Sequence, residues 1–183
     1  MSRQPQSQVP PGGWDRPVAG PPPITAPYAA WWNRVGAALF DLLVISVPAV
    51  VLAIVIFGGV GAAFSTGDGF GIFALIVGLV AYVTLLFAAL LLYAPLLMRR
   101  EGANNGQTWG KQLLGIRVIR TNGVPMDFAQ SAIREALVKG LGLGIASSII
   151  PFIPYILDAL WPLWDDENRA IHDMIVATRV VEA

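Results

Sequence analysis

Two long apolar stretches dominate the first half of the chain. Residues 35–60 contain a single charged side chain, Asp41, and residues 72–98 contain none. A hydrocarbon core about 30 Å thick is crossed by a helix of roughly 20 apolar residues, so both stretches are long enough to span it. We predict transmembrane helices over about 35–57 and 72–98, joined by a loop rich in Gly, Ser and Thr.

The second half has a third apolar stretch, but prolines interrupt it. Residues 136–164 are apolar apart from Lys139 and Asp158. Because proline breaks or kinks a helix interior, one kinked span and a helix-break-helix hairpin both fit the pattern. Helices are expected over about 128–149 and 153–164, with the interruptions at Pro151, Pro154 and Pro162.

Two short segments have the β-branched content of strands. Residues 116–120 read Ile-Arg-Val-Ile-Arg and lead into the turn Thr121-Asn122-Gly123, and residues 177–181 form a similar segment near the end of the chain. Each is the most natural partner of the other. Their pairing would place the C-terminus beside the 99–135 segment and would favour the hairpin interpretation of residues 136–164.

The distribution of basic residues predicts the orientation. Lys and Arg accumulate in short loops that stay cytoplasmic, and the loop between the first two helices has none. We therefore expect the N-terminus and the 99–135 segment in the cytoplasm, in a multi-pass protein of the plasma membrane. The basic residues of the linker that follows the second helix are Arg99, Arg100, Lys111, Arg117, Arg120, Arg134 and Lys139.

Residues 1–30 differ from the rest and form a separate region. They contain eight of the fourteen prolines and no apolar run, so they lack the hydrophobic core of a signal peptide. Such a composition favours an extended, polyproline-like tail, which is either a disordered extension or a docking arm. The predicted fold is thus an all-α membrane domain over 31–183, a small polytopic bundle of three to four transmembrane or re-entrant helices with a short cytoplasmic β-like element.

Composition removes several classes of function. The chain is 55% apolar and 13% charged, with zero formal net charge, which suits a bilayer and gives no overall attraction to nucleic acid. Without cysteine there is no disulfide, iron–sulfur cluster, thiolate zinc site or cysteine nucleophile. No nucleotide-binding, hydrolase or metalloprotease motif is present, so we predict neither an enzyme nor a cofactor or metal site.

Arg34 and Asp41 are the charged residues placed on the first apolar helix. They are two turns apart on one face, roughly 10 Å along the axis, and cannot pair with each other. Each needs compensation at this depth. Asp41 is either neutralised by a cation from another segment or is itself a proton or cation site. Asp158 lies beside two tryptophans in the sequence and is expected at the membrane interface. The neighbours His172 and Asp173 suggest a hydrogen-bonded structural pair.

Several motifs together resemble the RDD family of membrane proteins, named for an arginine and two aspartates. Arg34 and Asp41 match the first two letters, and Arg169 with His172-Asp173 resembles the closing motif. The stretch from Thr108-Trp109-Gly110-Lys111 to Gly115-Ile116-Arg117 resembles the family's central segment, followed by its turn at 121–125, where Asn122 replaces the more usual aspartate. Arg134 falls where members often have an arginine.

The resemblance implies little about function. Most members are uncharacterised, and a few are linked to sodium/proton exchange. The Pro-rich extension resembles that of actinobacterial members, for which the resemblance suggests an accessory role beside a larger membrane complex, such as a respiratory one. We therefore carry two hypotheses: a non-catalytic accessory or scaffold subunit, and an oligomeric cation/proton transporter acting through Asp41. The expected partners are the bilayer and either other membrane subunits or further copies of the chain. We also predict one charge network containing Arg34, Asp41, Arg134 and Asp173.

Overall fold

The computed structural model describes residues 25–67 and 69–183, so most of the predicted proline-rich tail lies outside the described residues. The described part is mostly helical with one small two-stranded sheet, in agreement with the predicted class. In chain order the elements are α1 (Trp31–Ser65), α2 (Phe70–Met98), η1 (Gly102–Asn104), α3 (Trp109–Leu113), β1 (Ile116–Arg120), α4 (Phe128–Ala132), η2 (Ile133–Gly142), α5 (Leu143–Ile149), α6 (Ile153–Leu160), η3 (Trp161–Leu163), α7 (Ile171–Ile175) and β2 (Thr178–Glu182).

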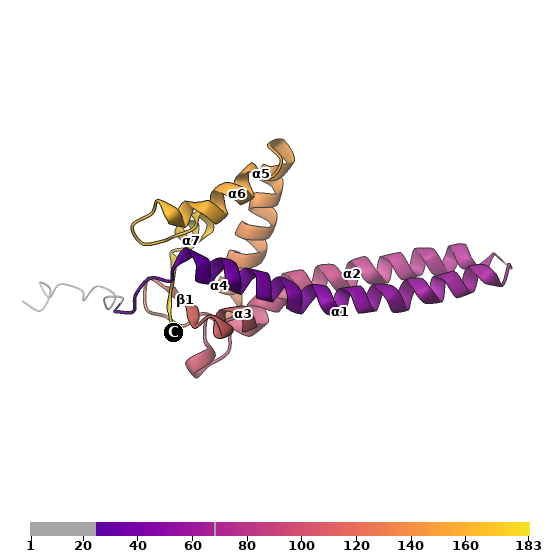
Figure 1. Cartoon of the computed structure of the whole chain (residues 1–183), viewed down its shortest axis with the longest axis horizontal. Coiled ribbons are helices and arrows are strands. Elements are labelled where there is room, and N and C mark those ends of the chain that lie inside the picture. Colours follow the sequence, from indigo (N-terminus) through magenta and orange to yellow (C-terminus); the bar gives the residue numbers. More distant parts are fainter. Residues whose placement is uncertain (1–24, 68) are drawn as a thin grey trace, which may run out of the picture.

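Helices α1 and α2 form a long antiparallel hairpin that projects from the rest of the protein (Figure 1). Each is long and apolar enough to cross a membrane, and none of its most apolar 18-residue window is buried inside the protein. The core helix of a soluble protein would be covered by other elements, whereas these helices leave their apolar side chains exposed. The hairpin therefore supplies two candidate membrane-spanning helices.

Helix α1 extends further than the predicted span of 35–57. It begins at Trp31 and continues through three glycines to Ser65, whereas we expected a loop from Gly58. Glycine costs a helix about 1 kcal/mol relative to alanine, which is why the sequence pattern indicates a loop there. In the structure α2 packs along this end of α1: a Cβ added at Gly78 would lie 2.9 Å from Ile56 Cγ2. Contact with a neighbouring helix thus outweighs the local preference.

The end of the hairpin joins a small head, which we define as residues 25–30, 99–127 and 165–183. Here β1 and β2 pair antiparallel with Val118 opposite Val180, which confirms the predicted pairing of the two segments. Around the sheet lies the main buried cluster, which includes Met98 from the end of α2 and Ala37 from α1. The C-terminus lies in this head, away from the tip of the hairpin (Figure 1).

Residues 128–164 form an arm that rises beside the hairpin (Figure 1). Its first limb is helical from Phe128 to Ile149, with residues 133–142 wound as a π-helix, and Asp127 caps its start by accepting from the Gln130 backbone N–H at 2.7 Å. The chain then reverses at Pro151 and Phe152, where Phe152 has φ of 63°. Of the two alternatives for residues 136–164, the structure has the helix-break-helix hairpin, because the proline interrupts the helix.

Candidate functional site

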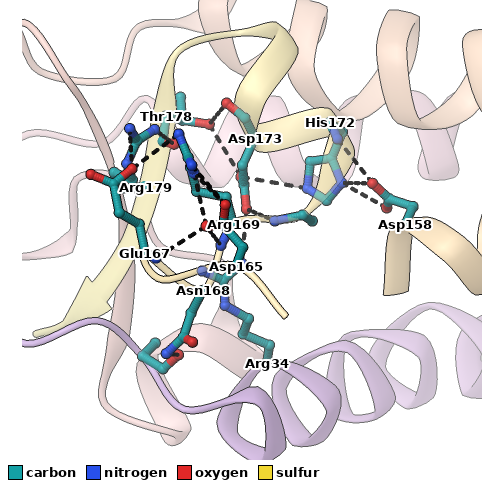
Figure 2. Close-up of polar contacts among 12 residues, drawn as sticks. Arg34, Asp158, Asp165, Glu167, Asn168, Arg169, His172, Asp173, Thr178 and Arg179 are labelled. Carbon is teal, nitrogen blue, oxygen red and sulfur yellow. Dashed lines mark hydrogen bonds and ion pairs between the residues drawn. The ribbon is translucent and has the colours of Figure 1, made fainter. Parts of the chain in front are cut away.

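Asp173 is the centre of a buried charge cluster where the head, the arm and α1 meet. Its carboxylate accepts from Arg34 Nη1 at 2.8 Å and from Arg134 Nη2 at 2.6 Å. Thr178 in β2 adds a hydroxyl hydrogen bond at 3.2 Å (Figure 2). The structure therefore brings together three of the four groups predicted to form one network, Arg34, Arg134 and Asp173.

The two arginines keep Asp173 ionised. Its side chain is fully buried, and burial alone would raise the pKa of a carboxyl group. The positive charges of Arg134 and Arg34 outweigh that effect and hold the pKa of Asp173 well below its usual range. A buried ion pair of this kind loses much stability when one partner is removed, because the other charge is then uncompensated.

His172 lies beside this centre and binds Asp158. Its Nδ1 is 2.7 Å from Asp158 Oδ2, and its backbone N–H donates to Asp158 Oδ1 at 2.9 Å (Figure 2). We expected Asp158 at the interface; in the structure its side chain is buried within the protein, between α6 and α7, and is only 4% exposed. The pairing of α6 with α7 explains the difference, since the sequence pattern places Asp158 near tryptophans but does not show that α6 folds back onto the head.

The environment of His172 predicts a loss of stability in acid. Burial and the charge of Arg134 lower its pKa below 6.5, against the opposing effects of Asp173 and Asp158. Below about pH 6.5 the folded state then binds fewer protons than the unfolded state. The free energy of unfolding is therefore highest above that pH and falls as the pH decreases, by at most about 1.4 kcal/mol per pH unit for one group.

We expect the unfolding temperature in detergent to fall as the pH is lowered from 7 to 5. This fall should be smaller in His172→Asn, because asparagine does not titrate and its amide N–H can replace the Nδ1–H of the histidine. A further fall below pH 4 should remain in both proteins, because the depressed pKa of Asp173 has the same sign of effect. Identical curves for the two proteins between pH 7 and pH 5 would contradict the assignment of a neutral, buried His172.

Asp41 makes none of the ion pairs of this cluster, so the prediction that it belongs to one network with Arg34, Arg134 and Asp173 is wrong. Its carboxylate accepts from Tyr93 Oη at 2.7 Å, from Thr108 Oγ1 at 2.5 Å and from the Gly110 backbone N–H at 2.7 Å. All three donors are uncharged. Hydrogen bonds to the charged form compensate a carboxylate without a cation, so Asp41 fastens α3 to both membrane helices.

Gly110 permits this contact because α3 lies against α1. A Cβ at Gly110 would overlap the carbonyl oxygen of Ala37 and lie 2.8 Å from Asp41 Oδ1. We expect Gly110→Ala to cost about 3 kcal/mol, as overpacking against backbone does, and to lower the yield of monodisperse protein. Gly58→Ala is the matched control, because that site on α1 has nothing within 4 Å; equal yields of both variants would contradict the close contact.

The cluster extends to the central 108–117 motif through Glu135, which the sequence interpretation missed. Glu135 pairs with Arg134, with Lys111 at 3.8 Å and with Lys139 at 3.6 Å. The available signal was its place in the sequence, because Glu135 directly follows Arg134 and lies four residues before Lys139, on the same helix face. Tyr93 was also missed; Tyr82 and Thr84 of α2 carry hydroxyl groups too, so the sequence does not single it out. The buried Lys111 has a lowered pKa because burial outweighs the attraction of Glu135.

Arg169 belongs to a second cluster and not to the Asp173 centre. It binds Asp165 at 2.6 Å and Glu167 at 3.1 Å, and Arg179 from β2 reaches the same Glu167 at 2.5 Å (Figure 2). This cluster joins the 165–170 loop to the sheet. The predicted grouping of Arg169 with Asp173 reflected their closeness in sequence, whereas in the structure Arg169 folds back on its own loop.

The remaining residues of the central motif have structural positions. Thr108 caps α3 by accepting from the Lys111 backbone N–H at 3.3 Å. Gly115 ends that helix with φ of 62°, the left-handed conformation that glycine adopts most easily. Arg117 follows within β1, half-buried. The motif thus builds the turn that joins the membrane hairpin to the sheet.

A cavity of about 850 Å³ lies between α1, α2, the arm and the head. Ionisable side chains gather in the lining toward the head, whereas the lining residues furthest along the hairpin, Ile45 and Phe87, are apolar. Within residues 25–67 and 69–183 there is no group of three or more His, Cys, Asp or Glu side chains that could hold a metal ion. The ionisable lining residues are Arg34, Asp41, Tyr93, Lys111, Arg134, Glu135, Lys139, Tyr155, Asp158 and His172.

An exposed apolar hairpin over a buried, charge-paired head defines a helical membrane protein. The chain belongs to the RDD family, whose profile matches residues 28–177, in agreement with the resemblance of its motifs. It is also 29% identical over 161 residues to "Uncharacterized protein YckC" of Bacillus subtilis (strain 168), with 85% of each chain covered. No solved structure matches the chain significantly.

Proposed function

We propose that this RDD-family protein is a non-catalytic accessory or scaffold subunit of a larger membrane complex, such as a respiratory one. The observation that carries the proposal is the uncovered apolar surface of the α1–α2 hairpin, whose most apolar windows are not buried by any part of the described chain. Two helices alone enclose no pathway, whereas the uncovered outer faces of the hairpin can pack against helices of other subunits.

The internal use of the charged residues also supports a structural role. Asp173 and Asp41, the two aspartates of the family motif, are both occupied by contacts within the chain. These contacts tie α1 to the arm and to α3. A fixed head on a membrane hairpin suits a protein that holds others in place, and the proline-rich tail of the actinobacterial type would serve as its docking arm.

Purification of the tagged chain from its native membrane in a mild detergent tests this proposal. We expect a defined set of membrane proteins at constant stoichiometry, quantified by mass spectrometry. A variant lacking residues 1–24 keeps every described element and should retain less of that set if the tail docks. A chain that purifies only with copies of itself would contradict the accessory role.

One observation favours a cation/proton transporter as a second candidate. Three carboxylates, Asp41, Glu135 and Asp158, line the cavity between the membrane hairpin and the arm, and intramembrane carboxylates commonly mark ion pathways. Such a transporter would need an oligomer to complete a path across the membrane. Against it, each of these carboxylates already has donors or cations in contact.

The proposed topology places the head in the cytoplasm of the cell and the hairpin tip outside. Seven basic residues lie between residues 99 and 139, directly after α2, and none lies between α1 and α2. Because β2 pairs with β1, the C-terminus lies with the 99–127 segment. The arm must then enter and leave the same membrane face, and α6 with η3 is too short to cross on its own.

Single-cysteine variants test this topology, since the natural chain has no cysteine. We expect a membrane-impermeant maleimide added to whole cells to label Ser65→Cys, at the exposed end of α1, and to spare Ala103→Cys and Ala183→Cys. All three should be labelled after the membrane is opened. Labelling of Ala103→Cys in intact cells would show that the topology is the reverse of the proposed one. Labelling of Ala183→Cys in intact cells, with Ala103→Cys still spared, would rule out a re-entrant arm.

A further inference from the structure

We propose that the cavity between the hairpin and the arm binds an anionic phospholipid, with the phosphate held by Arg34, Lys111 and Lys139. This inference is independent of the accessory role, because it concerns a lipid of the surrounding bilayer and not a protein partner. It rests on the unmet hydrogen-bond donors of the cavity, on its apolar end and on its level in the membrane.

The ionisable end of the cavity has more donors than acceptors. Arg34 uses Nη1 for Asp173, while its Nε and Nη2 are buried without a partner within the described residues. Lys111 and Lys139 each have three donor protons, and their shared partner Glu135 lies at 3.8 Å and 3.6 Å. Buried donors without acceptors are costly, so this end suits a group rich in acceptor oxygens.

The charges around the cavity leave donors for an anion. Four cationic side chains and the three carboxylates Asp41, Glu135 and Asp158 line the cavity, and Asp173 makes the formal charges equal. Asp41 is already occupied by three uncharged donors. Asp173, behind the lining, is shared between Arg34 and Arg134. A phosphodiester adds one negative charge and accepts from several donors at once.

The other end of the cavity distinguishes a lipid from a free phosphate. Leu42 and Ile45 of α1 and Phe87, Leu90 and Leu91 of α2 line it. These residues lie on the membrane hairpin, so acyl chains can follow this wall out of the cavity into the bilayer. A soluble phosphate would leave this apolar wall facing water.

The level of the site matches that of a lipid headgroup. Trp31, at the start of α1, lines the cavity and donates from Nε1 to the Ala159 backbone oxygen at 2.7 Å. Indole rings favour the headgroup zone of a membrane, and basic pockets between membrane helices on the cytoplasmic side bind anionic headgroups. The cationic end therefore lies where the phosphate of an inner-leaflet lipid would be.

Native mass spectrometry of the full chain in detergent tests the proposal with phosphatidylglycerol and with phosphatidylcholine of the same acyl chains. We expect phosphatidylglycerol to bind about tenfold more tightly, and Lys139→Gln to reduce that preference about fivefold, the usual contribution of one basic residue. Lys139 is 43% exposed on its side chain, so this variant should fold. Arg120→Gln is the matched control, because Arg120 is basic, lies in β1 and does not line the cavity.

Arg34→Lys gives a second test, since it keeps the positive charge and removes the Nε and Nη2 donors. A monodisperse Arg34→Lys protein should also lose the preference. Equal binding of the two lipids by the natural protein, or equal losses in Lys139→Gln and Arg120→Gln, would overturn the site. Glycerol 3-phosphate that binds as tightly as phosphatidylglycerol would overturn the lipid assignment and indicate a soluble phosphate compound.

Discussion

Asp173→Asn is expected to lower the free energy of unfolding by about 3 to 5 kcal/mol, the usual effect of removing one member of a buried pair. Asparagine keeps the shape of the side chain, but Arg34 and Arg134 then lose the carboxylate that both contact. The contacts of α1 with the arm and α7 should weaken together. The yield of monodisperse protein on size exclusion in detergent, together with the unfolding temperature, measures the effect.

Asp166→Asn is the matched control, because Asp166 is an exposed carboxylate in the loop before α7. Removal of a charge alone should not change the yield, so this control should resemble the natural protein. Arg134→Gln in the Asp173→Asn protein should cost less than Arg134→Gln alone, since groups in one network are not additive. An Asp173→Asn protein as abundant and as stable as Asp166→Asn would show that the cluster does not hold the fold.

Asp41→Asn is the second large effect, with an expected loss of about 2 to 3 kcal/mol, because hydrogen bonds to a charged group are the strong ones. The Gly110 backbone N–H can only donate, and asparagine has one acceptor oxygen where the carboxylate has two. The side-chain NH2 of the asparagine would then face a hydroxyl group that donates to Asp41 in the natural protein. Helix α3 should separate from α1, and the amount of folded protein should fall.

Tyr93→Phe gives a graded comparison for this site. It removes one of the three donors and leaves the carboxylate with Thr108 and Gly110, so we expect a smaller loss of about 1 kcal/mol. Thermal unfolding in detergent measures both variants under one condition. If Asp41→Asn were as stable as the natural protein while Tyr93→Phe was not, Asp41 could not be the anchor described above.

The elements that could be predicted from the sequence are those with local signals. The β-branched segments 116–120 and 177–181 predict two strands and their pairing, and the structure pairs them as β1 and β2. The break at Pro151 likewise follows from the missing N–H of proline. Grouping of Arg34, Arg134 and Asp173 followed from the cost of unpaired charge at membrane depth, because few other partners were available.

The partners of Asp41 and Asp158 could not be predicted, for two different reasons. Asp41 is compensated by a backbone N–H and two hydroxyls, and backbone donors leave no mark in a sequence. Asp158 depends on how far α6 folds back toward α7, which is set by the packing of the arm. The length of α1 was also missed, because its last turns are held by α2, whose Gly71 and Gly78 lie against Phe64 and Ile56 of α1.

The most direct test of a structural, non-transporting role measures proton flux in proteoliposomes that contain the purified chain. If the buried charges hold the head to the membrane hairpin, the natural protein should show no sodium- or potassium-dependent proton flux above that of protein-free vesicles, and Asp41→Asn should be poorly folded. Exchange of sodium or potassium for protons by the natural protein, with flux lost in an Asp41→Asn protein of normal abundance, would contradict this role and support the transporter.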